Sequence, residues 1–461
     1  MTKFPLSQRR AAVARSWDLR DGAALIPSGL PVPVPGSDQV HSFHPHPEFT
    51  YLAGVQTAGS VLAFDSTDGW SLFAPVAGQE ERVWVGPGER LEELARSSGL
   101  DAVRPLSELH TWLESHRAEP IALLGNRDLA QQPWAYAIDG WSALELALDF
   151  ELADRLSDEV SEARRAKDAL EIDCMRTAVA ASVRGHLAAL RLARPGMTER
   201  QLQIELESEF FRAGSARTAY GSIVGSGPNA AILHSSPSAR TFVPGDLLLI
   251  DAGAEHNGYA SDVSRTFPVD AAFTGIQRDL YQLVHDVQAA AIAAVRPGVE
   301  YRDLHLAACL GIASGLVDLG ILRGGPEDLV ERDAHALFFV HGLGHMLGLA
   351  THDAGGCLAG RAASDRFGLK WLRADLPLEP GYVVTIEPGI YFIEALLKDP
   401  RRRETFADAV NWPLVDSLAD FGGIRIEDDV LVTESGADVL TAALPSAIAQ
   451  IEAIRAEALS S

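Results

Sequence analysis

Two aspartates are the first residues whose type and spacing could support chemistry, and they lie in the segment 246–267, DLLLIDAGAEHNGYASDVSRTF. Apolar residues flank Asp251 and Asp262, and an Asn-Gly pair between them is typical of a β-hairpin turn. With a turn centred near His256 and Asn257, the two carboxylates lie opposite each other on one face. Because like charges that face each other are unfavourable, the pair indicates either solvated loop acids or a site that holds a positive charge.

A second group lies in the motif HGLGH at 341–345 and in the Thr-His-Asp sequence around His352. Two histidines four apart, His341 and His345, could bind zinc on a helix of the HExxH type, but Gly342 occupies the position of the glutamate. The glycines instead predict a tight loop. The motif therefore indicates a loop that carries histidines and argues against a zinc-protease helix.

Two further acids end apolar strands towards the end of the chain. Glu387 follows GYVVTI and precedes a Pro-Gly pair that stops the strand. In GGIRIEDDVLV, alternation places Arg425 and Glu427 on the same face of a strand. An arginine beside a carboxylate is by itself typical of an exposed salt bridge, so only the four acids together indicate a site.

If Asp251, Asp262, Glu387 and Glu427 converge, their four negative charges require strong positive charge nearby. Two divalent cations would balance them, and carboxylate ligation with one imidazole suits manganese, with cobalt or zinc as alternatives. Two such ions about 3.5–4 Å apart can share a bridging water and make hydroxide available near neutral pH. The pattern predicts a hydrolase without a serine or cysteine nucleophile, in which neutral histidines donate hydrogen bonds to an oxyanion.

The composition sets outer limits on this function. The 461 residues suffice for two domains, and contents of 47% hydrophobic and 22% charged residues are ordinary for a globular protein. A formal net charge of −24 argues against binding to nucleic acid or to an anionic membrane. Three separated cysteines indicate neither a disulfide framework nor a thiolate metal site. The start of the chain lacks an apolar signal core, and no later stretch could span a bilayer, so we expect a cytoplasmic protein.

Residues 1–157 are predicted to form an α/β domain with a mixed sheet. Short apolar runs predict strands at 60–64, 71–76, 82–85 and 121–124, and helical spacing predicts helices at 90–97 and 106–115. Three histidines cluster in HSFHPHP, but the interleaved prolines favour an extended turn over a metal cage. The tryptophans that we expect in the core of this domain are Trp70, Trp84, Trp112, Trp134 and Trp141.

Residues 158–461 are predicted to form the second domain, of α+β class. A helical pattern begins near Asp158 and runs to Leu190, with a charged opening that suits an exposed connector between the domains. Thr198 and Gln201 form a capping-box signature at the start of the next helix. Further helices are predicted at 276–295 and 301–319, among segments of hairpin type.

The ordered motifs LLLIDAG, SDVSRTF, HGLGH, THD, TIEPGIYF and GGIRIEDD resemble those of the pita-bread metallopeptidases, which include prolidases, aminopeptidase P and, more distantly, methionine aminopeptidases. The resemblance covers about residues 160–440. The segment 391–422 and the earlier HPHPEFTYLAG also resemble the bacterial Xaa-Pro dipeptidases, including those called organophosphorus acid anhydrolases. The resemblance implies a pita-bread C-terminal domain of α+β class and a smaller α/β N-terminal domain.

The resemblance also implies a role for each residue that matches a family motif. The implied ligands of two metal ions are Asp251, Asp262, His345, Glu387 and Glu427. The implied catalytic residues are His234, near the substrate backbone, His352, which steadies the tetrahedral intermediate, and Glu387, which shuttles protons. The implied substrate-binding residues are Tyr220, His341, Arg373 and Arg425, of which Arg373 would meet the free carboxylate of the substrate.

We therefore expect a metal-dependent dipeptidase, a prolidase, that hydrolyses Xaa-Pro dipeptides by attack of a metal-bridging hydroxide. Because proline lacks an N–H, its recognition requires a dedicated pocket. The alternatives are an aminopeptidase P that accepts longer Xaa-Pro peptides and, from another class, a non-catalytic binding module on the same fold. The resemblance further implies a side activity on organophosphate triesters. It also implies a homodimer in which the N-terminal domain of the partner subunit narrows the active-site entrance.

Overall fold

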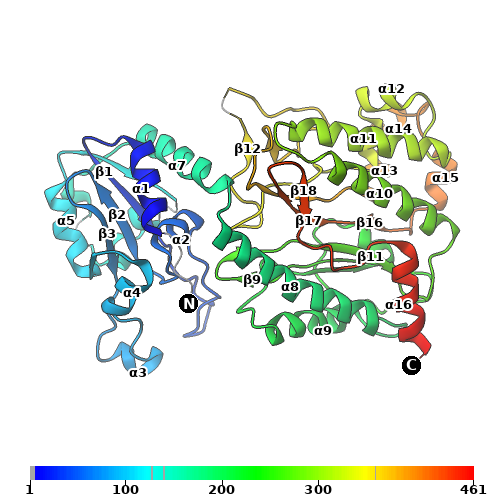
Figure 1. Ribbon diagram of the computed structural model, residues 1–461. Coiled ribbons are helices and arrows are strands. Elements are labelled where there is room, and N and C mark those ends of the chain that lie inside the picture. Colours follow the sequence, from blue (N-terminus) through cyan, green and yellow to red (C-terminus); the bar gives the residue numbers. More distant parts are fainter. Residues whose placement is uncertain (1–5, 126–127, 139–140, 359, 461) are drawn as a thin grey trace. The chain divides into compact units, whose positions relative to one another are not determined.

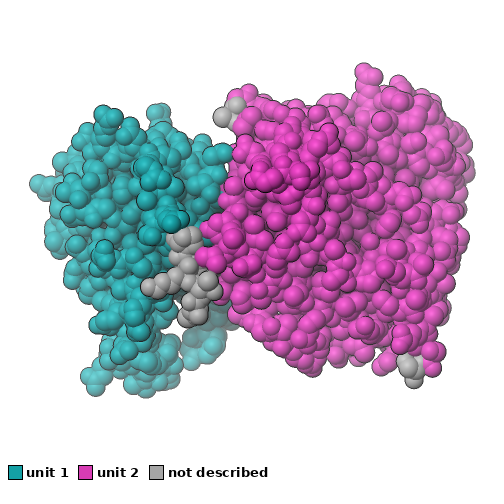
Figure 2. Space-filling model, in the orientation of Figure 1, with its two compact units in different colours: residues 1–164 teal, residues 165–461 magenta. Residues whose placement is uncertain are grey.

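The computed structural model describes residues 6–125, 128–138, 141–358 and 360–460. The chain forms two compact units, which comprise residues 1–164 and 165–461 (Figures 1 and 2). The boundary predicted between residues 157 and 158 falls inside helix α7 (Phe150–Arg165), and the units divide at the C-terminal end of this helix. The acidic residues of the expected connector lie on the outer face of this helix, whereas Arg164 is buried with the apolar residues of its inner face. Lys167, beyond the end of the helix, is buried as well.

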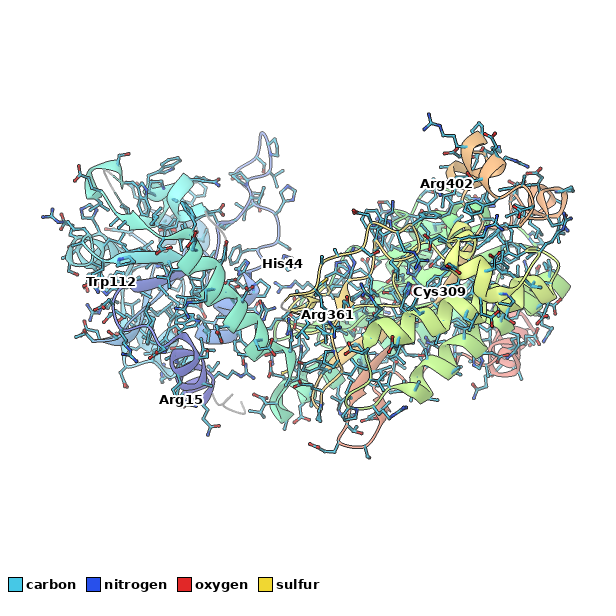
Figure 3. The ribbon with its side chains drawn as sticks, turned by 90° about the horizontal axis from the view of Figure 1, so that it is seen from above. Arg15, His44, Trp112, Cys309, Arg361 and Arg402 are labelled. Atoms are coloured by element: carbon cyan, nitrogen blue, oxygen red, sulfur yellow. The ribbon has the colours of Figure 1, made fainter. Side chains whose placement is uncertain are left out.

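The first unit contains a six-stranded mixed sheet. Its remaining elements are α1 (Leu6–Trp17), β1 (Ala23–Pro27), α2 (Pro47–Ala53), β2 (Val61–Asp65), β3 (Gly69–Ala74), α3 (Glu81–Val85), α4 (Leu91–Ser98), β4 (Ala102–Pro105), η1 (Leu106–Glu108), α5 (Leu109–Ser115), β5 (Pro120–Leu123), α6 (Asp128–Gln131), η2 (Pro133–Tyr136), η3 (Trp141–Leu144) and β6 (Ala147–Leu148). The strand order is β4-β3-β2-β1-β5-β6, in which β2 is antiparallel to both of its neighbours. The core includes Phe73 and Trp112, and the latter is labelled in Figure 3.

Two expectations for the first unit are wrong. The segment 82–85, expected as a strand, lies in the short helix α3, where every residue is exposed. Its Val-Trp-Val run resembles a strand, but none of the described strands pairs with it, and the N–H of Gly86 closes a helical turn on the carbonyl of Arg82. Trp84 and Trp134 are 82% and 67% exposed, so they do not belong to the core.

The second unit places short, mostly antiparallel strands between two pairs of long helices. Its elements are α8 (Ala169–Leu192), α9 (Glu199–Arg212), β7 (Ile223–Ser226), η4 (Gly227–Ala231), β8 (Leu247–Asp251), β9 (Glu255–His256), β10 (Tyr259–Ala260), β11 (Ser264–Pro268), α10 (Gly275–Ala294), α11 (Tyr301–Asp318), α12 (Pro326–Glu331), η5 (Ala334–Leu337), β12 (Gly356–Cys357), β13 (Ala374–Asp375), β14 (Val383–Ile386), β15 (Gly389–Tyr391), α13 (Glu394–Leu397), α14 (Pro400–Thr405), α15 (Trp412–Ser417), β16 (Gly423–Arg425), β17 (Asp428–Val432), β18 (Ala437–Val439) and α16 (Ile448–Ser460). Helices α8 and α9 lie along one side of the strands, and α10 and α11 lie along the other (Figure 1). None of the helices in the described part of the chain combines the length and the apolar character that crossing a bilayer requires.

The long helix expected from Asp158 is instead two helices, α7 and α8. Asp168 caps α8 by accepting hydrogen bonds from the N–H groups of Glu171 and of the residue before it, and the Glu171 carboxylate accepts one from the Asp168 N–H. This capping box starts a new helix within the helical pattern. The capping box predicted at Thr198 and Gln201 is present at the start of α9.

The hairpin that carries the two aspartates is present, but its register differs from the prediction. Its turn is centred on Asn257 and Gly258, which have φ values of 53° and 88°. Asp251 of β8 consequently pairs with Ser264 of β11 and not with Asp262. Because this shift moves the partner by two positions, Asp262 keeps the same face as Asp251.

A second set of antiparallel strands brings the other two acids together. Strand β14 pairs with β17 so that Ile386 lies opposite Asp428. Continuing this register by one residue places Glu387 opposite Glu427. An isolated β-bridge between Ser264 and Glu427 then joins these strands to the hairpin. The four acids therefore meet where the two strand systems touch.

Candidate active site

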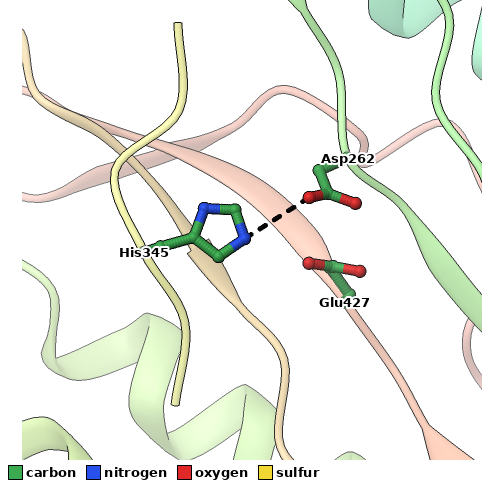
Figure 4. A group of neighbouring side chains, drawn as sticks. All are labelled: Asp262, His345 and Glu427. Atoms are coloured by element: carbon green, nitrogen blue, oxygen red, sulfur yellow. Dashed lines mark ion pairs between the residues drawn. The ribbon is translucent and has the colours of Figure 1, made fainter. Parts of the chain in front are cut away.

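Three of the predicted metal ligands form a compact group at this junction. One ligand atom from each of Asp262, His345 and Glu427 lies within 4.8 Å of the others, and all three side chains are buried (Figure 4). His345 Nε2 lies 3.4 Å from Asp262 Oδ2. The two acids lie just before strands β11 and β17, whereas the histidine comes from the loop 341–345, which is non-helical as its glycines predict.

The other two predicted ligands border this group. The hydroxyl of Tyr220 lies 2.6 Å from Oδ1 of Asp251 and within hydrogen-bond distance of Oδ1 of Asp262, so both carboxylates contact one oxygen. Glu387 Oε1 lies 3.5 Å from His345 Nε2. The fold thus brings all five predicted ligands around one small volume.

The electrostatics of this acid cluster favour a cation. Burial and the neighbouring carboxylates raise the pKa values of Asp262, Glu387 and Glu427, that of Glu387 to about 7. Burial lowers the pKa of His345, but the carboxylates of Asp262 and Glu387 raise it by more than burial lowers it, so the net shift is upward. Acids this close can ionise together only when cations balance them. Carboxylate oxygens with one imidazole nitrogen are a donor set that fits divalent metal ions.

Neighbouring polar groups that the motifs did not single out hold these acids. Ser264 donates from its hydroxyl to Glu427 Oε2 at 2.7 Å. Asp429 accepts the backbone N–H of Asp262 at 3.2 Å. The position of Asp429, two residues after Glu427 on an alternating strand, is a signal that could have indicated it. Ser264 carries no comparable signal, because a serine in a strand is common.

Arg425 joins the acid cluster to a buried tyrosine. Its guanidinium donates to Asp251 Oδ2 at 2.6 Å and to the hydroxyl of Tyr391 at 2.8 Å. That hydroxyl lies 2.8 Å from His341 Nε2, and His341 Nδ1 lies 2.8 Å from the carbonyl of Gly342. Burial and Arg425 lower the pKa of His341 to about 3, so its ring is neutral. Since a carbonyl only accepts, Nδ1 carries the proton and Nε2 accepts from the tyrosine. His341 therefore offers its ring surface to the site, and both ring nitrogens bond within the protein.

The acid cluster opens into a cavity of about 780 Å³, and all the predicted catalytic, metal-ligand and substrate-binding residues line it. His234 and Arg373 are exposed there. The ring of His352 stands edge-on to that of His345, with centroids 4.5 Å apart. Partial burial, together with His345 and Arg373, lowers the pKa of His352 to about 4. His352 is therefore neutral near pH 7, and its ring N–H can donate a hydrogen bond to a developing negative charge.

The fold and the acid cluster together define a metallopeptidase of the pita-bread class. Residues 173–434 match metallopeptidase family M24, and residues 6–121 match the N-terminal domain of aminopeptidase P. The chain therefore belongs to metallopeptidase family M24, and the fold class predicted from the sequence is confirmed. Membership of this family agrees with the divalent-metal donor set of the cluster.

The proteins that are similar to this chain include both peptidase types considered above. The structure of Pseudomonas aeruginosa aminopeptidase PepP superposes with a TM-score of 0.83 at 31% identity, covering all of both chains. Aminopeptidase P from E. coli with the inhibitor Pro-Leu gives a TM-score of 0.81 at 30% identity, again over both whole chains. The Xaa-Pro dipeptidase of Homo sapiens is 33% identical over 416 residues, which are 88% of this chain and 83% of the relative. A probable Xaa-Pro aminopeptidase of Coccidioides posadasii is 32% identical over 447 residues, which are 94% and 93% of the two chains.

Proposed function

We propose that this protein is an Xaa-Pro dipeptidase, with an Xaa-Pro aminopeptidase of the aminopeptidase P type as the alternative. The observation that carries the first choice is Arg373, which is exposed and lines the same cavity as the acid cluster. Arg425, the arginine beside the acids, is already bound to Asp251. In the described part of the chain no carboxylate pairs with Arg373, so its guanidinium is available to a substrate.

A dipeptide that ends in proline presents its free carboxylate directly after the bond to be cleaved. Because the imide nitrogen has no hydrogen to donate, this carboxylate is the strongest polar group on that side of the bond, and a guanidinium can bind it with two hydrogen bonds. A longer peptide lacks the charge at this position. The similarity to human Xaa-Pro dipeptidase supports this choice, whereas the similarity to two solved aminopeptidases P supports the alternative.

We infer that the five clustered ligands, Asp251, Asp262, His345, Glu387 and Glu427, hold two divalent ions, with Mn²⁺ as the first choice and Co²⁺ or Zn²⁺ as alternatives. When bound, such ions supply Lewis acidity and lower the pKa of water. Glu387 accepts the proton of the attacking water and returns it to the proline nitrogen as the imide bond breaks. His352 and His234 donate hydrogen bonds to the oxygen of the attacked carbonyl.

The test compares turnover of Ala-Pro and Ala-Pro-Ala by the Mn²⁺-loaded protein. A dipeptidase cleaves Ala-Pro faster, and Arg373→Ala raises the KM for Ala-Pro about 10- to 100-fold, because a charged hydrogen bond contributes roughly 1.5–3 kcal/mol. Lys370→Ala is the matched control, since it removes a positive charge from the same segment without lining the cavity. Faster cleavage of the tripeptide, with no effect of Arg373→Ala, would establish the aminopeptidase P alternative.

Three further expectations belong to this proposal. Hydrolysis of organophosphate triesters requires the same activated water, so a chromogenic triester should be cleaved only by the metal-loaded protein. The homodimer stays a prediction, which the molar mass from light scattering in solution tests. The cytoplasmic location also stays a prediction, which cell fractionation tests. A non-catalytic binding module is disfavoured because all five ligand positions carry ligating side chains, and peptide turnover would exclude it.

A further inference from the structure

A short stretch of chain, residues 165–167, holds the loop that carries His352. Lys167 Nζ lies 3.0 Å from Asp353 Oδ2, and the two side chains are 0% and 1% exposed. The Arg165 guanidinium adds hydrogen bonds to the carbonyls of Ala354 and Gly355, at 3.3 and 3.4 Å. Lysine and aspartate are thus paired out of contact with water, directly next to a residue of the active-site cavity.

A buried ion pair is weak evidence for a role in stability. Removing both charges from water opposes folding by several kcal/mol, and apolar residues of similar volume often stabilise as well or better. The packing around this pair is also exact, because a Cβ on Gly348 would come within 2.2 Å of Asp353 Oδ2 and 2.8 Å of Lys167 Cε. We therefore infer that the Lys167–Asp353 pair serves to fix the position of the chain segments that carry it.

The backbone of the pair connects it to the segments that carry the acid cluster and its histidine. The N–H of Asp353 donates to the carbonyl of Met346, the residue after His345, at 2.9 Å. The N–H of Lys167 donates to the carbonyl of Gly381 at 2.8 Å, in the turn that leads into β14. Among the described residues no ion pair holds His352, whose ring lines the cavity beside that of His345. Its position consequently depends on the anchoring of Asp353.

We propose that Lys167 is a positioning residue for the peptidase reaction, which acts by anchoring Asp353 so that the ring of His352 faces the carbonyl under attack. The proposal rests on the role of His352 in the proposed function. Lys167 does not touch the substrate, so its effect must pass through His352. Misplacing a catalytic group by about 1 Å can lower the rate on the order of 100-fold.

The experiment is a double-mutant cycle with Lys167→Met and His352→Ala, measured on whichever peptide the Mn²⁺-loaded protein cleaves faster. We expect Lys167→Met to lower kcat about 100-fold with little change in KM. In the His352→Ala background the same substitution should lower kcat by less than about threefold, because coupled residues are not additive. The proposal would be overturned if Lys167→Met lowered kcat by the same factor in the His352→Ala background as in the wild-type protein. Full turnover by His352→Ala would overturn it as well. In that case the error would lie in the catalytic role assigned to His352 under the proposed function.

A second variant separates positioning from stability, since Lys167→Met removes the lysine that pairs with the buried Asp353 and the variant could fail to fold. Lys167→Met with Asp353→Leu removes both charges and should recover the Tm. We expect its kcat to stay about 100-fold low, because the loop has lost its anchor. Recovery of wild-type kcat together with the Tm would overturn the proposal. Arg176→Met is the control. It removes from the adjoining helix α8 an arginine whose exposed ion pair is with Asp438 of β18, so it should leave kcat unchanged.

Discussion

Both units bury titratable side chains, but among the described residues the second unit is the one that gathers four carboxylates around one imidazole. In the first unit, burial raises the pKa of Glu48, and burial together with Arg164 lowers the pKa of His46 to about 4. Burial thus favours the neutral form of each group, and Ser157 donates a hydrogen bond to Glu48. A single buried carboxyl can become neutral, so it needs no cation. Where four acids surround one imidazole, burial and the neighbouring acids raise the pKa values of three of them, and all four can be ionised together only when cations balance them.

The comparison teaches that convergence, and not a local density of histidines, distinguishes a metal centre. The segment HSFHPHP of the first unit has more histidines than HGLGH, yet His41 and His44 are exposed, the latter labelled in Figure 3. Within the residues that the structure describes, the group close enough to share an ion is Asp262, His345 and Glu427 of the second unit.

Removing metal should produce the largest difference between the units. Dialysis against a chelator is expected to lower peptide turnover at least about 10⁴-fold, because it removes the Lewis acids that activate the attacking water. Mn²⁺ should restore turnover, and metal analysis should find two ions per chain. Unhindered turnover by protein shown to be free of metal would contradict the proposal.

Glu387→Gln should lower kcat about 10³-fold, because an amide cannot accept the proton of the attacking water. Glu48→Gln is the matched control in the first unit, where a buried carboxyl has the same chemistry but no acid cluster around it. We expect this control to keep its kcat. Similar losses in both variants would indicate a general effect of removing a buried acid and would remove the distinction between the units.

The stability of the metal-free protein should depend on pH through Glu387. Its pKa is raised from an ordinary value near 4.5 to about 7, chiefly by burial. Between these values the folded state binds more protons than the unfolded state, so the stabilisation is present below about pH 4.5 and is lost as the pH rises through about 7. We expect the Tm of the metal-free protein to fall by about 5 °C over this range, a loss of order 2 kcal/mol. Glu387→Gln should remove this part of the pH dependence, and an unchanged profile would contradict the assignment.

The smallest effect is expected in the first unit. His41→Ala and His44→Ala alter exposed side chains, so kcat should change by less than about twofold and the metal content should stay the same. Loss of a bound ion in either variant, measured by metal analysis, would show that this histidine cluster is a site after all.

The parts of the fold that could be predicted rest on short-range signals. The capping box of Thr198 and Gln201 joins residues three apart, and helices α10 and α11 lie within one residue of their predicted ranges. The prediction at 82–85 was wrong because a Val-Trp-Val run gives the same signal in a strand as in an exposed turn of helix. The capping box of Asp168 carried a readable signal, an acid three residues before Glu171, but the continuous apolar stripe concealed it.

The sequence by itself determined which side chains could carry the chemistry, and that the acids end strands while His345 lies in a glycine loop. These properties depend on residue type and on hydrogen bonds between near neighbours. Only the tertiary structure decided that Tyr391 engages His341, 50 positions away, and that Lys167 meets Asp353 across 186 positions. Such contacts form where packing brings distant segments together, and no pattern within one segment specifies them.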